Sequence, residues 1–167
     1  MIRPVTLADA PQIAALYNEY IVNTTITFEE EPVSAADIES RITDYTRSFP
    51  WLVFEEDGVL RGYCYATRWR ARSAYRHSAE TTVYVRPEDH GKGIGSALYS
   101  RLIDDMSGGN THVLVAGIAL PNDKSVRLHE RQGFAKVAHF HEIGRKFDRW
   151  LDIGYWELKL NRSSDSA

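Results

Sequence analysis

The chain has 167 residues, of which 43% are hydrophobic and 26% charged, and its formal net charge is -3. These values are ordinary for one soluble globular domain, and the slight acidity disfavours a general nucleic-acid binder, which would present a basic face. A single cysteine, Cys64, excludes an intramolecular disulfide and a CxxC motif and fits a reducing, cytoplasmic environment. No apolar run is long enough for a transmembrane helix and no targeting signature is present, so we expect no membrane partner.

The first elements predicted along the chain are a short strand at 2–5 and a helix. Thr6 or Asp9 caps this helix, since both side chains can accept a bond from the helix start. Its apolar positions follow helical spacing: Ile13, Leu16, Tyr17, Tyr20 and Ile21. A weaker helix is expected at about 34–47.

Strands dominate the next segment. Residues 51–55 are typical of a strand, and Asp57-Gly58 indicates a tight hairpin turn. The returning strand runs from 59 to about 69, with Gly62 marking a bulge. After an arginine-rich loop, a further strand is expected at about 79–85.

The remaining segments predict two more helices and three strands. A helix begins at Ile94 and ends near Gly108. The continuous apolar run 113–120 predicts a strand buried on both faces. Asn122 or Asp123 begins the second helix, which Gly133 ends.

Two final strands are expected near 134–143 and 153–160. We therefore predict one α/β domain over residues 1–160 with a mixed sheet. A polar, disordered tail is expected at 161–167.

The most informative segment is a strand, a glycine-rich turn and a helix start at 81–96. Its turn reads His90-Gly91-Lys92-Gly93-Ile94-Gly95. The first N–H groups of a helix lack partners and are positively polarised, and glycine leaves them open to an anion. The segment therefore predicts a phosphate-binding site.

Two well-known phosphate-binding loops fit this segment poorly. A P-loop requires Gly-Lys-Ser/Thr, whereas Lys92 is followed by Gly93. A dinucleotide fingerprint requires Gly-x-Gly-x-x-Gly with an acidic residue about 20 positions on. Here only one residue separates Gly93 from Gly95.

The loop resembles the coenzyme A pyrophosphate loop of the GNAT N-acetyltransferase superfamily, whose motif is Arg/Gln-x-x-Gly-x-Gly/Ala. His90 takes the usual Arg or Gln position, so its charge would be partial near neutral pH. Asn122, Ser125 and His129 resemble the second cofactor helix of the superfamily, where Tyr is common at the last of these positions.

Further segments resemble the phosphinothricin and methionine sulfoximine acetyltransferase subfamily. They are 50–53, 69–72, Tyr75, 80–85, 120–123, 125–130 and 144–147, with Trp150 and Asp152. The resemblance implies a GNAT-like domain whose mixed, mostly antiparallel sheet is flanked by helices, and a homodimer. It also implies an N-acetyltransferase that moves the acetyl group of acetyl-CoA to the amino group of a small amino acid or amino-acid analogue.

The resemblance places acetyl-CoA on the central strand, loop and helix start. The implied cofactor-binding residues are Val83, Tyr84, Val85, His90, Gly91, Lys92, Gly93, Ile94, Gly95, Ser96, Asn122 and Ser125. Backbone N–H groups around Val83 and Val85 would also stabilise the developing oxyanion.

Two side chains are candidates for proton transfer. An ammonium group cannot attack a thioester, so the site needs a general base, and Glu80 matches the proposed catalytic glutamate of the family. The alternative is a glutamate paired with a nearby arginine. His129 could protonate the leaving thiolate; the alternatives are a core histidine or a helper of cofactor binding.

Four residues match positions of the subfamily's substrate site: Phe28, Arg70, Arg72 and Tyr75. Arginine suits bidentate recognition of a carboxylate or phosphinate, although a solvated basic loop is the alternative.

His139 and His141 could share a strand face, but no carboxylate stands at a motif spacing, so we expect no metal. A peptide or protein N-acetyltransferase and a non-catalytic acyl-CoA-binding module stay open as alternative functions.

Overall fold

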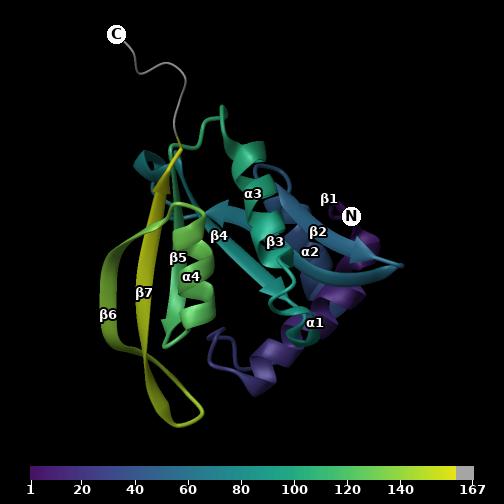
Figure 1. Ribbon diagram of the computed structural model, residues 1–167, viewed down its shortest axis with the longest axis horizontal. Coiled ribbons are helices and arrows are strands. Elements are labelled where there is room, and N and C mark those ends of the chain that lie inside the picture. The colour runs from purple at the N-terminus through teal and green to yellow at the C-terminus, as the bar shows by residue number, and fades with distance from the viewer. Residues whose placement is uncertain (161–167) are drawn as a thin grey trace.

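The computed structural model describes residues 1–160, which form one seven-stranded sheet in the order β1-β2-β3-β4-β5-β7-β6 (Figure 1). The strands are β1 (Ile2–Pro4), β2 (Trp51–Glu56), β3 (Val59–Arg68), β4 (Ser78–Val85), β5 (Val113–Leu120), β6 (Ala135–Lys146) and β7 (Arg149–Lys159). Every neighbouring pair is antiparallel except β4 and β5. The predicted mixed, mostly antiparallel α/β sheet is confirmed, and the tail predicted at 161–167 lies outside the described residues.

Helices cover both faces of the sheet. They are α1 (Ala10–Asn23), α2 (Ala35–Tyr45), α3 (Ile94–Met106) and α4 (Asp123–Arg131). α1 and α2 share one apolar core with β2 and β3, while α3 and α4 pack against the other face (Figure 1). None of the helices in residues 1–160 is both long and apolar enough to span a membrane.

The starts of α1 and α4 follow the predicted capping residues, and α2 begins where the weaker helix is expected. Asp9 is the N-cap of α1, and Thr6 forms a capping box with Asp9 around the short 3-10 turn that precedes it. Ser34 caps α2 by accepting a hydrogen bond from the amide of Asp37. Asn122 does the same for α4 through the amide of Ser125.

The prediction that β5 is buried on both faces is wrong. Leu114, Ala116 and Ile118 are buried in the core, but Gly117 on the opposite face is exposed. An apolar run cannot reveal this, because Gly117 carries no side chain and its surroundings depend on the distant segment β4.

The last two strands are longer than predicted. β6 extends to Lys146 and β7 begins at Arg149, and the turn between them places Phe147 and Asp148 at φ values of 49° and 57°. Asp148 tolerates this conformation but Phe147 is not a usual turn residue, so the sequence carries only a weak signal for this turn.

The two central strands pair over only three residues. Ser78, Ala79 and Glu80 of β4 lie opposite Val113, Leu114 and Val115 of β5. Beyond that point β4 continues along β3, and β5 continues along β7, so the two strands diverge (Figure 1). The sheet therefore contains an opening between two of its own strands.

The β6–β7 hairpin is fastened to the loop between α1 and α2. The ammonium of Lys146 is buried and donates to the carbonyl of Thr27 at 2.9 Å. Burial lowers the pKa of Lys146, and the nearby carboxylates of Glu29 and Glu30 oppose that shift. Next to it, the ring of Phe28 occupies the space that a side chain at Gly144 would need.

This contact predicts a coupled effect of two substitutions. Gly144→Ala should destabilise the fold by about 1–3 kcal/mol, because its methyl group would overlap the Phe28 ring. Thermal unfolding should show a Tm lower by about 3–10 °C. In a Phe28→Ala background the same substitution should have little further effect, and an equal loss of Tm in both backgrounds would contradict this packing.

Candidate active site

The glycine-rich turn follows β4 and ends at the first residue of α3. Gly91 and Gly93 both have φ values of +82°, a backbone conformation that other residues rarely adopt. A Cβ built at either glycine would meet nothing within 4 Å. The backbone of the turn is therefore open to an approaching ligand.

This turn also presents unpaired donors. No hydrogen bond in residues 1–160 uses the amides of Gly91, Gly93, Ile94 or Gly95. These amides lie at the positive end of the α3 dipole, where an anion is stabilised. The geometry therefore suits a phosphate or diphosphate group.

The two polar side chains of the turn are engaged by protein groups. The ammonium of Lys92 pairs with the buried carboxylate of Asp89 at 2.6 Å. His90 Nε2 lies 2.9 Å from the hydroxyl of Tyr20 and 3.1 Å from the carbonyl of Val85. Both residues thus hold the turn in place, and the backbone supplies its free donors.

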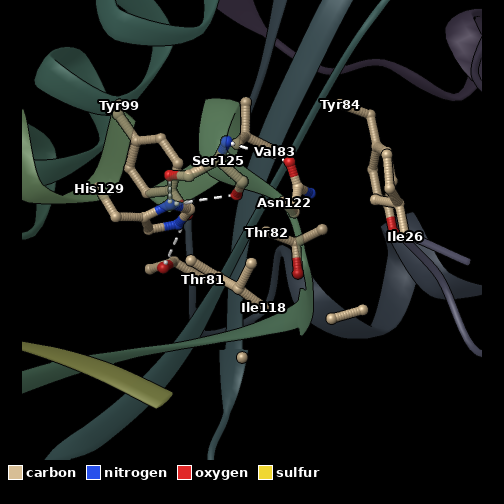
Figure 2. Close-up of a pocket in the computed structure, with 12 residues that line it drawn as sticks. Ile26, Thr81, Thr82, Val83, Tyr84, Tyr99, Ile118, Asn122, Ser125 and His129 are labelled. Atoms are coloured by element: carbon tan, nitrogen blue, oxygen red, sulfur yellow. Dashed lines mark hydrogen bonds between the residues drawn. The ribbon is translucent and has the colours of Figure 1, made fainter. Parts of the chain in front are cut away.

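A pocket of about 80 Å³ occupies the opening between β4 and β5 (Figure 2). β4 contributes Thr81, Thr82, Val83 and Tyr84; β5 contributes Gly117, Ile118 and Ala119; α4 and its N-cap contribute Asn122, Ser125 and His129. Four of the predicted cofactor residues, two on β4 and two at the start of α4, therefore meet at one pocket.

The backbone of β4 also points donors into this opening. The amide of Arg86, the residue after β4, donates to the carbonyl of Arg61 on β3, so this amide points toward β3. Successive amides of a strand alternate in direction. The amides of Val83 and Val85 therefore point away from β3 and into the opening between β4 and β5.

His129 is buried in the pocket wall in its neutral form. Its Nδ1 lies 2.7 Å from the carbonyl of Ser125, which can only accept, so Nδ1 carries the proton. Nε2 is then free to accept from the Tyr99 hydroxyl at 2.8 Å (Figure 2). Burial lowers the pKa of His129, and the bond to the Ser125 carbonyl opposes that shift.

Tyr99 is a site residue that sequence reasoning missed. Its hydroxyl lies between His129 Nε2 and the hydroxyl of Thr81, which is 3.1 Å away. The side chain is fully buried on the core face of α3, where a tyrosine looks like any apolar residue in the sequence. Only the packing of α3 against α4 reveals its polar contact.

Glu80 lies on the opposite face of β4 from Thr81 and Val83, because strand side chains alternate. It is partly buried, and no hydrogen bond or ion pair joins its carboxylate to any other part of residues 1–160. Burial raises the pKa of Glu80, and the positive charge of Arg70 opposes that shift. The alternative of a glutamate paired with an arginine is therefore not seen.

An aromatic side chain, Tyr155, lies close to Glu80, since both side chains border the position that a Cβ at Gly117 would take. Trp69 and Tyr155 contact each other edge to face at 5.4 Å, and Tyr155 also lies against Gly117. The guanidinium of Arg70 stacks on Trp69 at 4.7 Å. The sequence alone indicates neither Tyr155 nor Trp69 as a substrate contact.

The structure gathers the predicted substrate residues only in part. Arg70 lies close enough to Glu80 to influence its pKa. Tyr75 lies on an exposed 3-10 turn, Ser73–Tyr75, of which Arg72 is the N-cap, and no hydrogen bond or ion pair within residues 1–160 joins either side chain to Glu80. Phe28 packs on Gly144 of the β6–β7 hairpin.

Comparison with known proteins agrees with this geometry. Residues 2–154 match the family described as the acetyltransferase (GNAT) domain. A phosphinothricin N-acetyltransferase from Streptomyces viridochromogenes is 38% identical over 156 residues, covering 93% of this chain and 85% of the relative. An L-methionine sulfoximine/L-methionine sulfone acetyltransferase from Salmonella typhimurium is 38% identical over 158 residues, covering 92% and 91%.

A similar solved structure is yncA from Salmonella typhimurium, determined with its cofactor acetyl-CoA. It superposes with a TM-score of 0.94 at 35% identity and covers 100% of this chain and 98% of its own.

The buried contacts of His129 predict its protonation behaviour. Nitrogen-detected NMR should show the Nδ1–H tautomer and no titration at the ordinary pKa of 6.5. The pKa of His129 is lower in the folded than in the unfolded chain. Its contribution to the free energy of unfolding is therefore fully present above about pH 6.5 and declines as the pH falls toward the folded-state pKa. A His129 signal that titrates at or above pH 6.5 would contradict the buried neutral form.

Proposed function

Because this chain belongs to the GNAT acetyltransferase family, we propose that it acetylates the amino group of a small amino acid or amino-acid analogue. The expected substrates are of the phosphinothricin and methionine sulfoximine or sulfone type, for which the two relatives are named. The observation that carries the proposal is the opening between β4 and β5. Among residues 1–160, four amides of the glycine-rich turn and the carboxylate of Glu80, which lies where the strands part, have no hydrogen-bond or ion-pair partner.

The residues of the opening fit acetyl-CoA, which supplies an acetyl thioester for the reaction. The amides of Gly91, Gly93 and Gly95 would hold the diphosphate, since no side chain blocks them and the α3 dipole favours negative charge. The amides of Val83 and Val85, which face the opening, would donate to the amide-bearing arm of acetyl-CoA, as they would to a neighbouring strand. Asn122 and Ser125 border the same pocket.

Glu80 is the proposed general base. A primary amine is mostly protonated at neutral pH, so one proton must leave before the nitrogen can attack. Partial burial raises the pKa of Glu80 and makes its carboxylate a better proton acceptor. The charge of Arg70 limits this rise and thus helps to keep the carboxylate ionised at neutral pH.

Two sets of groups would act on the acetyl thioester, one at its acyl oxygen and one at its departing sulfur. The amides of Val83 and Val85 are placed to donate to an acyl oxygen as negative charge develops on it. On the α3 and α4 face, His129 would orient the Tyr99 hydroxyl at the pocket wall, and Tyr99 would turn its one proton from His129 Nε2 to the departing sulfur. We assign His129 this orienting task because its own proton faces the Ser125 carbonyl.

Assembly and location belong to the same proposal. We propose a homodimer in the cytoplasm, as in the sequence interpretation. In support, half of the large exposed hydrophobic side chains of residues 1–160 lie on the β6–β7 hairpin: Val137, Phe140, Ile143, Phe147 and Trp150. A hairpin with this composition is suited to contact another protein surface.

The activity is tested by release of coenzyme A thiol. We expect release with acetyl-CoA and L-methionine sulfone, L-methionine sulfoximine or phosphinothricin, and an acetylated product by mass spectrometry. The matched control is N-acetyl-methionine sulfone, which lacks the free amine. Thiol release with none of a broad amine panel would refute the enzyme assignment to this substrate class, whereas acetylation of peptides alone would favour the peptide alternative.

The base assignment is tested by Glu80→Gln. We expect kcat to fall by about 10²–10⁴-fold with little change in the KM for acetyl-CoA, because general-base catalysis is lost. In the wild type, kcat/KM should fall as the pH drops through a Glu80 pKa above the ordinary value of 4.5. The substrate amine contributes the same pH dependence to both proteins, so the difference between their profiles isolates Glu80.

The control is Glu39→Gln, an exposed residue of α2. It should retain full activity and the wild-type profile. A Glu80→Gln profile that coincides with the wild type would show that another group accepts the proton.

A further inference from the structure

We propose that His139, His141 and Asp152 form a binding site for one divalent ion of the late first-row metals, such as Zn²⁺ or Ni²⁺. Within residues 1–160, each of the three offers a ligand atom, and these atoms all lie within 4.8 Å of one another. The site lies on the β6–β7 hairpin. The sequence showed the two histidines but not the carboxylate, which the antiparallel partner strand supplies.

An irregularity in strand pairing brings the three side chains together. The register between β6 and β7 moves from Phe140 opposite Ile153 to Gly144 opposite Leu151. Residues 141–143 therefore oppose the single residue Asp152. Such a bulge bends a strand and redirects its side chains.

The carboxylate of Asp152 is oriented before any ion binds. Its Oδ1 accepts the amide of Glu142 at 2.8 Å. Its Oδ2 lies 2.8 Å from His139 Nε2 and 3.2 Å from His141 Nδ1. The backbone amide of Glu142 thus fixes one carboxylate oxygen, and the other oxygen faces both imidazoles. In metal sites, ligating carboxylates are commonly oriented by such a hydrogen bond.

Movement of the exposed His141 ring would admit an ion. Metal–ligand distances of about 2.0–2.1 Å place tetrahedral ligand atoms about 3.4 Å apart. The two nitrogen–oxygen distances, 2.8 and 3.2 Å, must therefore open by about 0.6 and 0.2 Å, and ligand atoms that lie up to 4.8 Å apart must approach by about 1.4 Å. His141 is 77% exposed, so its ring can move and the ion can complete its coordination with water.

Lys136 competes with the ion. Its ammonium lies 3.2 Å from His139 Nδ1 and can only donate, so His139 presents its Nε2 proton to Asp152 without metal. With metal on Nε2, the proton moves to Nδ1 and Lys136 must withdraw. The ring of Trp156, 5.3 Å from the ammonium, offers it another contact.

The ligand set indicates the class of ion. Two imidazoles and one carboxylate suit Zn²⁺, Ni²⁺ or Cu²⁺, whereas Mg²⁺ and Ca²⁺ prefer oxygen ligands alone. The site is distinct from the proposed reaction centre, since Glu80 takes no part in it. It is nevertheless close to the pocket, because Asp152 pairs with Leu120 at the end of β5.

The test uses tag-free, EDTA-treated protein titrated with ZnCl₂. Calorimetry should show one saturable site, and the Tm should rise by about 5 °C or more at a hundredfold excess over Kd. His141→Gln and Asp152→Asn should weaken binding at least tenfold. Lys136→Gln should tighten it, because a competing positive charge is removed.

The controls separate ligand loss from unfolding. His112→Gln removes an exposed histidine outside the cluster and should bind Zn²⁺ as the wild type does. His141→Gln should keep the metal-free Tm, since its side chain is mostly exposed, and MgCl₂ should change nothing. The proposal is overturned if the wild type shows no saturable Zn²⁺ binding, or if His141→Gln binds as tightly as the wild type.

Discussion

The early separation of β4 from β5 is the constraint on which the rest of the site depends. After three paired residues, β4 follows β3 to Val85 and β5 follows β7 to Leu120. Each strand is thus fully paired on its outer side and unpaired on its inner side. Unpaired backbone polar groups that are buried cost free energy, so the opening favours an occupant that can pair with them. The break in the sheet and the binding site are the same feature.

The opening also determines which groups lie on which side of the reaction. The chain leaves β4 through the glycine-rich turn into α3, and it leaves β5 through Asn122 into α4. Two helix starts, with their positive dipole ends, therefore lie next to the opening. Alternation along β4 places Glu80 on one face and the Thr81–Tyr99–His129 contacts on the other. Burial disfavours the charged forms of both Glu80 and His129, which raises the pKa of one and lowers that of the other.

Local features of this fold could be predicted from the sequence, whereas contacts between distant segments could not. Ser34 and Asn122 indicate helix starts because each side chain accepts a hydrogen bond from an amide only three residues away. The glycine-rich turn was equally evident, since its open backbone depends on its own residues. The exposure of Gly117 and the Tyr99–His129 contact depend on segments far apart in the chain, and one sequence carries no signal for them.

The groups proposed to carry out the reaction and the groups that border the substrate space come from different elements. The proposed base and oxyanion donors lie on β4 alone, a strand fixed by full pairing with β3. The groups that surround Glu80 come from other elements: Trp69 follows β3, and Tyr155 belongs to β7. The buried Lys146 and the Phe28 ring fasten the same hairpin to the α1–α2 loop. Changes in the hairpin or loop can therefore reshape the space in front of Glu80 while the strand that carries the reacting groups keeps its position.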